Sequence, residues 1–305
     1  MLLIVFYHCI CPYGVWTNAE YSTNLSVPIW SVLIGVLSSI HLPMFFVLAG
    51  YLFGYKRNLG GYGDIILFAK GKFLRVVIPY IFVGLLIVII QKERVIGLLT
   101  GISHLWFLMT IFECYIAGRV LDKTLLLDLK YKKIVLLICF VTILVETRFT
   151  IDISLFTIKQ FCIYFPIYFV GMILGSCPLT KNKRAYTLGL AIGSFLILIW
   201  SRFYPIVGLS RISGFVFVIS IFLFMRSHSD CRISASLTSL DKCSMGVYIV
   251  HHILIQEMNR VGFFHSLMIS HYILYPIIQF ALITLVSWYM VQMLQKNRIT
   301  KYIVG

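Results

Sequence analysis

Long apolar runs, separated by short polar segments, make up almost the whole chain. A helix needs about 20 apolar residues to cross the hydrocarbon core of a membrane, and runs of about that length recur throughout. The pattern predicts nine spanning helices, at 29–55, 74–91, 103–121, 134–147, 159–177, 185–201, 210–226, 243–262 and 271–295. Because no polar domain interrupts these runs, we expect residues 1–305 to form a single all-α membrane domain.

A shorter apolar run occupies residues 1–11. As a helix it would cover about 16 Å of a roughly 30 Å hydrocarbon core. We therefore expect either that residues upstream of Met1 belong to the protein or that this helix inserts only half way. No basic segment precedes the run, so a signal peptide is not indicated. The prediction is a bundle of about ten transmembrane helices, the first one truncated.

Composition excludes the other broad classes. Hydrophobic residues make up 60% of the 305 residues and charged residues 12%. An ordinary soluble domain is about 45–50% apolar and about 25% charged, so a soluble, disordered or collagen-like protein does not fit. The strands of an outer-membrane barrel alternate in hydropathy, and the unbroken runs of this chain do not.

The net charge of +15 has a topological explanation. If the N-terminus is cytoplasmic and sides alternate, 19 of the 26 basic residues fall on the cytoplasmic side and seven on the other. Cytoplasmic loops of membrane proteins collect Lys and Arg, so both termini are expected inside. The segment 12–28 carries one acidic and no basic residue, as an external loop should. Nucleic acid is therefore not needed as a partner.

The chain gives little sign of a metal or disulfide site. None of the eight cysteines forms a CxxC pair, and most lie within apolar runs, where cysteine behaves as a small hydrophobic residue. No paired carboxylates stand at ligand spacing, so we expect no metal.

Four histidines lie in predicted spans, namely His8, His41, His104 and His251. Ionisable residues are costly within a membrane and are therefore candidates for function. Each one alone could instead be a neutral histidine hydrogen-bonded between helices. Glu113 is the deepest acidic residue, about 13 Å further along a helix than His104. It could orient a histidine or pair with an arginine for purely structural reasons.

The basic pair Lys72 and Arg75 lies on the predicted cytoplasmic side, where the span 74–91 begins. Three residues apart, the two side chains would share one face of a helix. Such a face suits a phosphate-rich ligand. The two basic residues can instead be ones that mark the cytoplasmic side of the membrane, or ones that contact anionic lipid.

Five segments, in order, resemble the acyltransferase 3 family of bacterial integral-membrane acyltransferases, and a sixth, residues 164–171, fits a weaker pattern of that family. They include a first-span histidine, an H-x-P-x-F-F segment, a basic start to the third span, an H-L-W-F-L segment and a G-x-Y-x-x-H segment. The matching residues are 5–8 (VFYH), 41–51 (HLPMFFVLAGY), 72–80 (KFLRVVIPY), 104–108 (HLWFL), 164–171 (YFPIYFVG) and 244–251 (SMGVYIVH). Two positions differ: an arginine that the family carries before the histidine would precede Met1, and Lys72 stands where an arginine is common.

The resemblance implies transfer of an acyl group, acetyl above all, from cytoplasmic acyl-CoA to a hydroxyl of an envelope glycan or glycolipid. The expected location is the bacterial cytoplasmic membrane. By this resemblance Lys72 and Arg75 bind the phosphates of the donor, and His8 serves as general base or transient acyl carrier. The other candidate catalytic residues, which would orient His8 or the substrate, are His41, Glu113 and His251. The candidate substrate-binding residues are His104, Trp106 and Tyr248.

Two other functions stay open. A transporter or flippase for a glycan or lipid-linked substrate would also use buried histidines, although such proteins often have two similar halves and this chain shows no clear repeat. The second of these alternatives is a non-catalytic relative that acts as a sensor or partner subunit.

Overall fold

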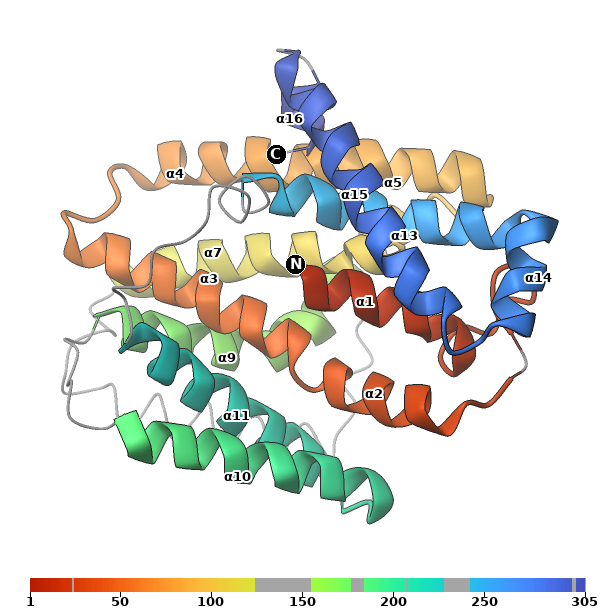
Figure 1. Ribbon diagram of the computed structural model, residues 1–305. Helices are drawn as coiled ribbons and strands as arrows, with labels where there is room; N and C mark the ends of the chain where they lie inside the picture. The colour runs from red at the N-terminus through yellow and green to blue at the C-terminus, as the bar shows by residue number, and fades with distance from the viewer. Residues whose placement is uncertain are drawn as a thin grey trace. The chain divides into compact units, whose positions relative to one another are not determined.

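The structure is a computed structural model that describes residues 1–23, 25–123, 155–176, 184–206, 208–227, 242–297 and 300–304. All regular structure within these ranges is helical, as the apolar pattern predicts. The elements (Figure 1) are α1 (Leu2–Ile10), η1 (Cys11–Tyr13), α2 (Pro28–Ser38), α3 (His41–Asn58), α4 (Ile65–Lys72), η2 (Phe73–Val77), α5 (Ile78–Gln91), α6 (Gly97–Thr100), η3 (Ser103–Leu105), α7 (Trp106–Lys123), η4 (Leu155–Thr157), α9 (Ile158–Ser176), α10 (Arg184–Phe203), α11 (Leu209–Arg226), α13 (Ser244–Arg260), α14 (Gly262–Ser270), α15 (Tyr275–Lys296) and α16 (Lys301–Val304).

Seven segments of the described chain are long and apolar enough to cross a membrane. They are Pro28–Asn58, Ile65–Gln91, Gly97–Asp122, Leu155–Ser176, Ala185–Phe203, Leu209–Arg226 and Tyr275–Lys296. Each overlaps one predicted span. The predicted span 243–262 is a helix, α13, of 17 residues and is not among the seven. The predicted span 134–147 lies outside the described residues, so a total of about ten stays a prediction.

The chain divides into two compact units. The first comprises Met1–His41 and Asp230–Gly305, and the second comprises Leu42–Ser229. The histidines at 8, 41 and 251 belong to the first unit. The basic pair, Glu113 and His104 belong to the second.

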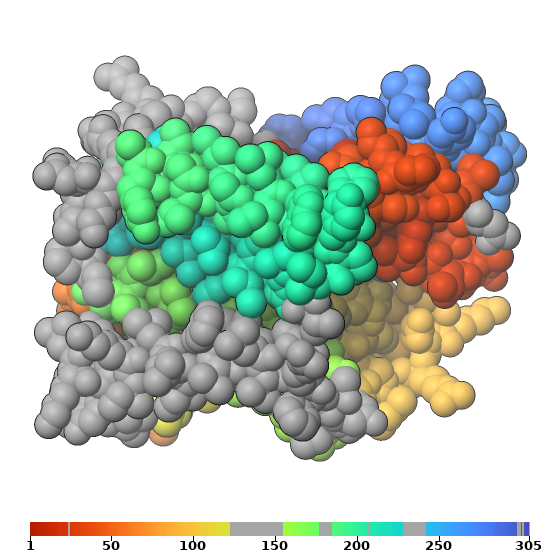
Figure 2. Space-filling model, turned by 90° about the horizontal axis from the view of Figure 1, so that it is seen from below, coloured from red at the N-terminus to blue at the C-terminus, as the bar shows by residue number. Residues whose placement is uncertain are grey.

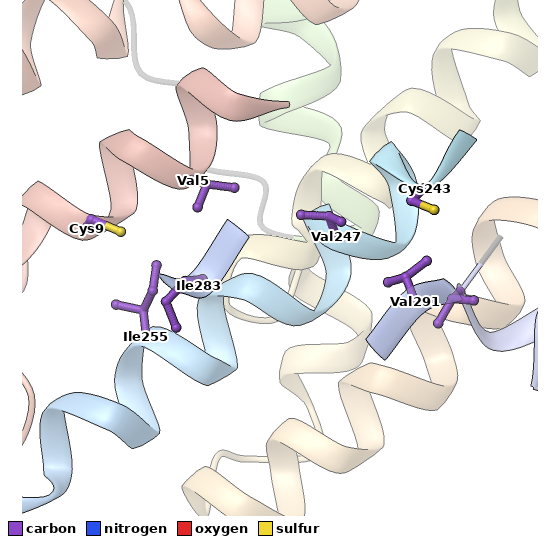
Figure 3. Packing of buried hydrophobic residues seen from close by; sticks show 8 residues of the cluster. Val5, Cys9, Cys243, Val247, Ile255, Ile283 and Val291 are labelled. Carbon is purple, nitrogen blue, oxygen red and sulfur yellow. The ribbon is translucent and has the colours of Figure 1, made fainter. Parts of the chain in front are cut away.

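The first unit has a core in which α1, α13 and α15 pack together. Val5 and Cys9 of α1 meet Val247 and Ile255 of α13 and Ile283 of α15 (Figure 3). Spacings of four residues place Val5 and Cys9 on one helix face, and likewise the residues at 247, 251 and 255. The apolar stripes that form this core therefore also fix the faces of α1 and α13 that carry histidines.

The predicted span 29–55 is broken at Ser39 and Ile40, which separate α2 from α3. The break follows from Pro43, which has no N–H for the carbonyl of Ser39 and whose ring crowds that carbonyl. His41 therefore stands at the start of α3 and not in the middle of a helix.

In the second unit, α3 and α9 approach each other through glycines. Gly50 and Gly54 of α3 form a G-x-x-x-G pair, and so do Gly171 and Gly175 of α9. A Cβ atom on any of the four would overlap a backbone carbonyl oxygen of the other helix. Small residues at this spacing let helix backbones come close within a membrane, where van der Waals packing is a principal attraction between helices.

The helices α10 and α11 pack side by side along much of their length. Figure 2 shows α10, in green, at the surface of the molecule. Its exposed side chains are largely apolar, including Leu188, Ile192, Leu196, Ile197 and Trp200. An apolar exposed face of this length suits contact with lipid.

Candidate functional site

His8 and His251 are hydrogen-bonded to each other. The Nδ1 atom of His8 lies 2.7 Å from the Nε2 atom of His251. The two imidazole rings are nearly parallel, with centroids 5.0 Å apart and an interplanar angle of 20°. His251 is fully buried, and His8 is partly buried. Two of the histidines predicted as candidates therefore form one pair, although 243 positions separate them in the sequence.

The hydrogen bonds determine which nitrogen of each neutral ring carries the proton. The Nδ1 atom of His251 lies 3.0 Å from the carbonyl oxygen of Val247, which can only accept, so this nitrogen carries the hydrogen. The Nε2 atom of a neutral His251 must then accept, and His8 must donate from Nδ1. The lone pair of His8 consequently sits on Nε2, which is the nitrogen that can take a proton or attack a carbonyl.

His252 and Trp16 complete an aromatic cluster around His8 that the sequence did not single out. The ring of His252 stands edge-on to that of His8, with centroids 4.8 Å apart. Trp16 is stacked beside His8 at 6.3 Å and lies 5.1 Å from His252. The available signals were the double histidine at 251–252 and a single tryptophan within an otherwise polar segment.

His41 lies in the same unit and meets the pair through Tyr7. Its ring is stacked on Tyr7 at 4.6 Å, and Tyr7 lies 5.3 Å from His8. The Nδ1 atom of His41 lies 2.5 Å from the carbonyl oxygen of Leu37, in the last turn of α2. The same carbonyl also accepts the N–H of Ile40 at 3.0 Å, so it has two donors just after α2 ends. His41 thus secures the break between α2 and α3.

Lys72 and Arg75 lie in the second unit on two different kinds of helix. Lys72 ends α4, whereas Arg75 lies within η2, a turn of π-helix. The N–H of Ile78 bonds to the carbonyl of Phe73, five residues back, and Pro79 offers no N–H to the carbonyl of Arg75. Such turns are frequent at functional sites. The helix between the two residues is therefore partly π-helical, and the shared face of Lys72 and Arg75 stays a prediction.

The ammonium group of Lys72 is held against aromatic rings. Its Nζ atom lies 3.6 Å from the centroid of Tyr115 and 5.7 Å from that of Phe68. A cation over a ring face is attracted by the negative face of the aromatic system. Lys72 is partly buried and Arg75 is exposed, so the two cations of the pair differ in their surroundings.

Glu113 is bound to a chain of hydroxyl groups. The hydroxyl of Thr157 donates to Oε2 of Glu113 at 3.0 Å and lies 3.0 Å from the hydroxyl of Thr110. Thr157 and its neighbour Phe156 both have positive φ angles, of 55° and 52°. Positive φ is unusual for bulky and β-branched residues, so this turn is strained beside Glu113.

The three residues expected to bind substrate divide between the units. In the second unit, His104 is buried in η3 with its Nδ1 atom 3.4 Å from the hydroxyl oxygen of Ser103. Trp106 begins α7 and is stacked on Tyr164 at 5.8 Å. Tyr248 lies in the first unit, buried on α13, with its ring 5.8 Å from that of His251. The structure therefore groups Tyr248 with the histidine pair.

The buried Arg119 is a further residue that sequence analysis missed. Its side chain donates to the carbonyl oxygens of Tyr62 and Gly63, at 2.7 and 2.5 Å, and pairs with Asp122 at 2.5 Å. Asp122 also pairs with Arg57 of α3. Burial raises the pKa of the Tyr62 hydroxyl to about 12. Together these bonds connect the end of α7 to the α3–α4 connection.

Within the described residues, no three His, Cys, Asp or Glu side chains are grouped as a metal ion would need. A paired histidine with a defined basic nitrogen can carry out proton transfer or nucleophilic attack.

The apolar helices and the histidine pair define an integral-membrane protein with a candidate acid–base centre, and comparison with known proteins adds the reaction class. An acyltransferase-domain family model, that of the acyltransferase 3 family, matches residues 1–292. The chain belongs to this family, whose members transfer acyl groups other than aminoacyl groups. This confirms the resemblance inferred from the motifs. No curated protein and no solved structure matches the chain.

Proposed function

We propose that the protein is a membrane O-acyltransferase that moves an acyl group, acetyl above all, from cytoplasmic acyl-CoA to a hydroxyl of an envelope glycan or glycolipid. The observation that carries the proposal is the His8–His251 hydrogen bond, with its second bond to Val247. This chain of bonds resembles the arrangement by which hydrolases and transferases orient a basic imidazole.

In the proposed reaction, Nε2 of His8 takes the proton of the acceptor hydroxyl as its oxygen attacks the thioester carbonyl carbon. The carbon–sulfur bond then breaks, and the proton passes from His8 to the departing thiolate. The products are the acyl ester and free CoA, so atoms and charge balance. His251 accepts the Nδ1 hydrogen of His8 throughout and stabilises the imidazolium that forms.

On the donor side, we assign the phosphates of acyl-CoA to Lys72 and Arg75. The partial burial of Lys72 over Tyr115 supports this role, since a positioned cation binds an anion at a lower entropic cost than a freely moving one. The proposal also places the protein in a bacterial inner membrane, as the family resemblance implies. Both termini are placed in the cytoplasm, for which the distribution of basic residues is the support. In the second unit, His104 and Trp106 are proposed to bind substrate, and Glu113 is proposed as a catalytic residue.

The direct test is acyl transfer with purified protein in vesicles, radiolabelled acetyl-CoA and a panel of glycans. The His8→Ala variant should lose transfer while inserting normally. The matched control is His271→Ala, because His271 is an exposed histidine of the same unit, directly after α14. Retained transfer in His8→Ala would refute the role of His8. Movement of glycan across the vesicle membrane without incorporation of label would instead indicate a transporter.

The same assay distinguishes a general base from an acyl carrier. Labelled donor without acceptor should leave no label on the protein if His8 acts only as a base. Acid-labile label on wild-type protein, absent from His8→Ala, would establish the transient carrier.

A further inference from the structure

The segment from Gly14 to Thr23 folds back beside His8 and is held in place by several hydrogen bonds. The N–H of Thr23 donates to the carbonyl of Pro12 at 3.0 Å, and the hydroxyl of Ser22 donates to the carbonyl of Asn18 at 2.6 Å. The side-chain amide of Asn259 donates to the carbonyl of Tyr21 at 3.2 Å. We call residues 14–23 the capping loop.

A second set of contacts fixes the capping loop to the end of α13. Arg260 lies 3.2 Å from a carboxylate oxygen of Glu20 and 2.7 Å from one of Glu257. Its guanidinium also lies 5.5 Å from the centre of the Tyr21 ring. Because α13 carries His251 and His252 as well, the helix that orients His8 also positions the loop.

The capping loop brings two partly exposed aromatic rings next to His8. Trp16 lies 6.3 Å from His8, and Tyr21 stands edge-on to Trp16, with centroids 5.5 Å apart. Both rings are partly exposed, and the polar side chains of Thr17, Asn18 and Glu20 are exposed around them. Ligand sites typically combine aromatic surface with a few polar groups in this way.

We propose that Trp16 and Tyr21 form the subsite that selects the acceptor, with Trp16 as the platform for a neutral sugar ring whose hydroxyl meets His8. A pyranose ring has an apolar face of C–H bonds and a rim of hydroxyls. The C–H bonds carry a partial positive charge and are attracted to the negative face of an indole. The hydroxyls can bond to the polar side chains of the loop.

Charge favours a neutral ring over a phosphate or another anionic group. The segment 12–28 contains one acidic and no basic residue. Arg260, the cation beside the loop, is paired with both Glu20 and Glu257. Recognition of an anion would need cations that are not already paired with carboxylates.

The test measures acceptor kinetics for the Trp16→Leu variant at a saturating concentration of acetyl-CoA. Leucine keeps an apolar side chain against the core of the first unit, which Trp16 contacts, but has no flat face. The two probes are methyl β-D-glucopyranoside, which is a ring, and D-glucitol, which is an open chain with similar hydroxyls. We expect KM for the glucopyranoside to rise roughly tenfold. For glucitol, both kcat and KM should change little. Trp16→Phe should restore most of the affinity.

The matched control is Trp200→Leu, because Trp200 is an exposed tryptophan of α10 in the second unit. Its kinetics should match those of the wild type. Equal changes for both probes in Trp16→Leu, or no change for the glucopyranoside, would overturn the proposal.

This inference rests on the proposed acyltransferase function, and the two can fail separately. Binding of methyl β-D-glucopyranoside to the His8→Ala variant, followed by saturation-transfer NMR, needs no turnover. Weaker binding to the double variant, His8→Ala with Trp16→Leu, than to His8→Ala alone supports the subsite, whether or not His8 acts in catalysis. Unchanged binding refutes the subsite even if His8→Ala abolishes transfer.

Discussion

A Cβ atom on Gly171 of α9 would overlap the backbone carbonyl oxygen of Val47 in α3. The relationship is reciprocal, because a Cβ on Gly50 of α3 would overlap the carbonyl oxygen of Tyr168 in α9. Both helix backbones therefore approach each other closely enough for Cα–H contacts to carbonyl oxygens. The glycines at 50 and 171 lie in segments that resemble the family pattern, and the contact gives a physical reason for glycine there.

The first prediction concerns this interface. Gly171→Ala should lower the free energy of unfolding by about 1–3 kcal/mol, because the added methyl group forces the two helices apart. The measurement is thermal unfolding in detergent. The control is Gly193→Ala in α10, where a Cβ meets nothing within 4 Å. That variant should be as stable as the wild type or slightly more, since alanine favours helix. Equal stability of both variants would contradict the prediction.

The fold could be predicted from the sequence as far as local patterns determine it. The length and hydropathy of the apolar runs locate the long helices, because backbone groups in lipid must be satisfied within the helix. The pairing of α3 with α9 could not be predicted, because it depends on which faces meet across more than 100 residues. The break before His41 was visible in principle from Pro43, yet a hydropathy window does not detect the loss of one N–H.

The second prediction concerns the tautomer of His8. His251→Leu removes the acceptor for the Nδ1 hydrogen of His8. The hydrogen of the neutral ring can then lie on either nitrogen, so the lone pair is no longer confined to Nε2. We expect kcat for acyl transfer to fall about 100-fold, with KM for the acceptor little changed. His251→Gln offers an amide oxygen as acceptor and should recover part of the rate. If His251→Leu and His251→Gln were equally active, the hydrogen bond from His8 to residue 251 would not orient His8 as the base.

The candidate site could be predicted only as a set of residues and not as an arrangement. Ionisable groups in apolar runs identify His8 and His251 by their cost, but the sequence does not say which of them meet. For Trp16 it offered only the signal of a single tryptophan in that segment, and for the capping loop it offered none. Their role depends on Arg260 and Asn259, more than 230 residues away, and such contacts form only in the folded chain.

The third prediction concerns the support of Lys72 by Tyr115. Tyr115→Leu removes the ring beneath the ammonium group, so Lys72 loses its fixed position. We expect KM for acetyl-CoA to rise up to about tenfold, the size of a partly desolvated cation–π contact. Tyr115→Phe keeps the ring face and should behave like the wild type. A rise of the same size in Tyr115→Phe would assign the effect to the phenol hydroxyl.

The fourth prediction uses the strained turn at η4. Phe156 has a φ of 52° and an exposed side chain, so glycine can adopt its backbone conformation without steric cost. We expect Phe156→Gly to raise the free energy of unfolding by about 1 kcal/mol. The neighbouring Leu155 is equally exposed and lacks a positive φ. Leu155→Gly should therefore destabilise the protein, because it only adds freedom to the unfolded chain. A loss of stability in both variants would show that the turn is not strained.

The last prediction concerns the buried charges at the end of α7. Asp122→Asn keeps the shape of the side chain but leaves the guanidinium of Arg119, which is 6% exposed, without its anion. Breaking a buried pair in this way should cost about 3–5 kcal/mol, measured by thermal unfolding in detergent. Arg57→Met should cost less than about 1 kcal/mol, because Arg57 is more exposed and its loss leaves Asp122 still paired with Arg119. A double variant, Asp122→Leu with Arg119→Met, removes both charges and should recover part of the stability lost in Asp122→Asn. If the double variant were less stable than Asp122→Asn, the bonds from Arg119 to the carbonyls of Tyr62 and Gly63 would outweigh the ion pair.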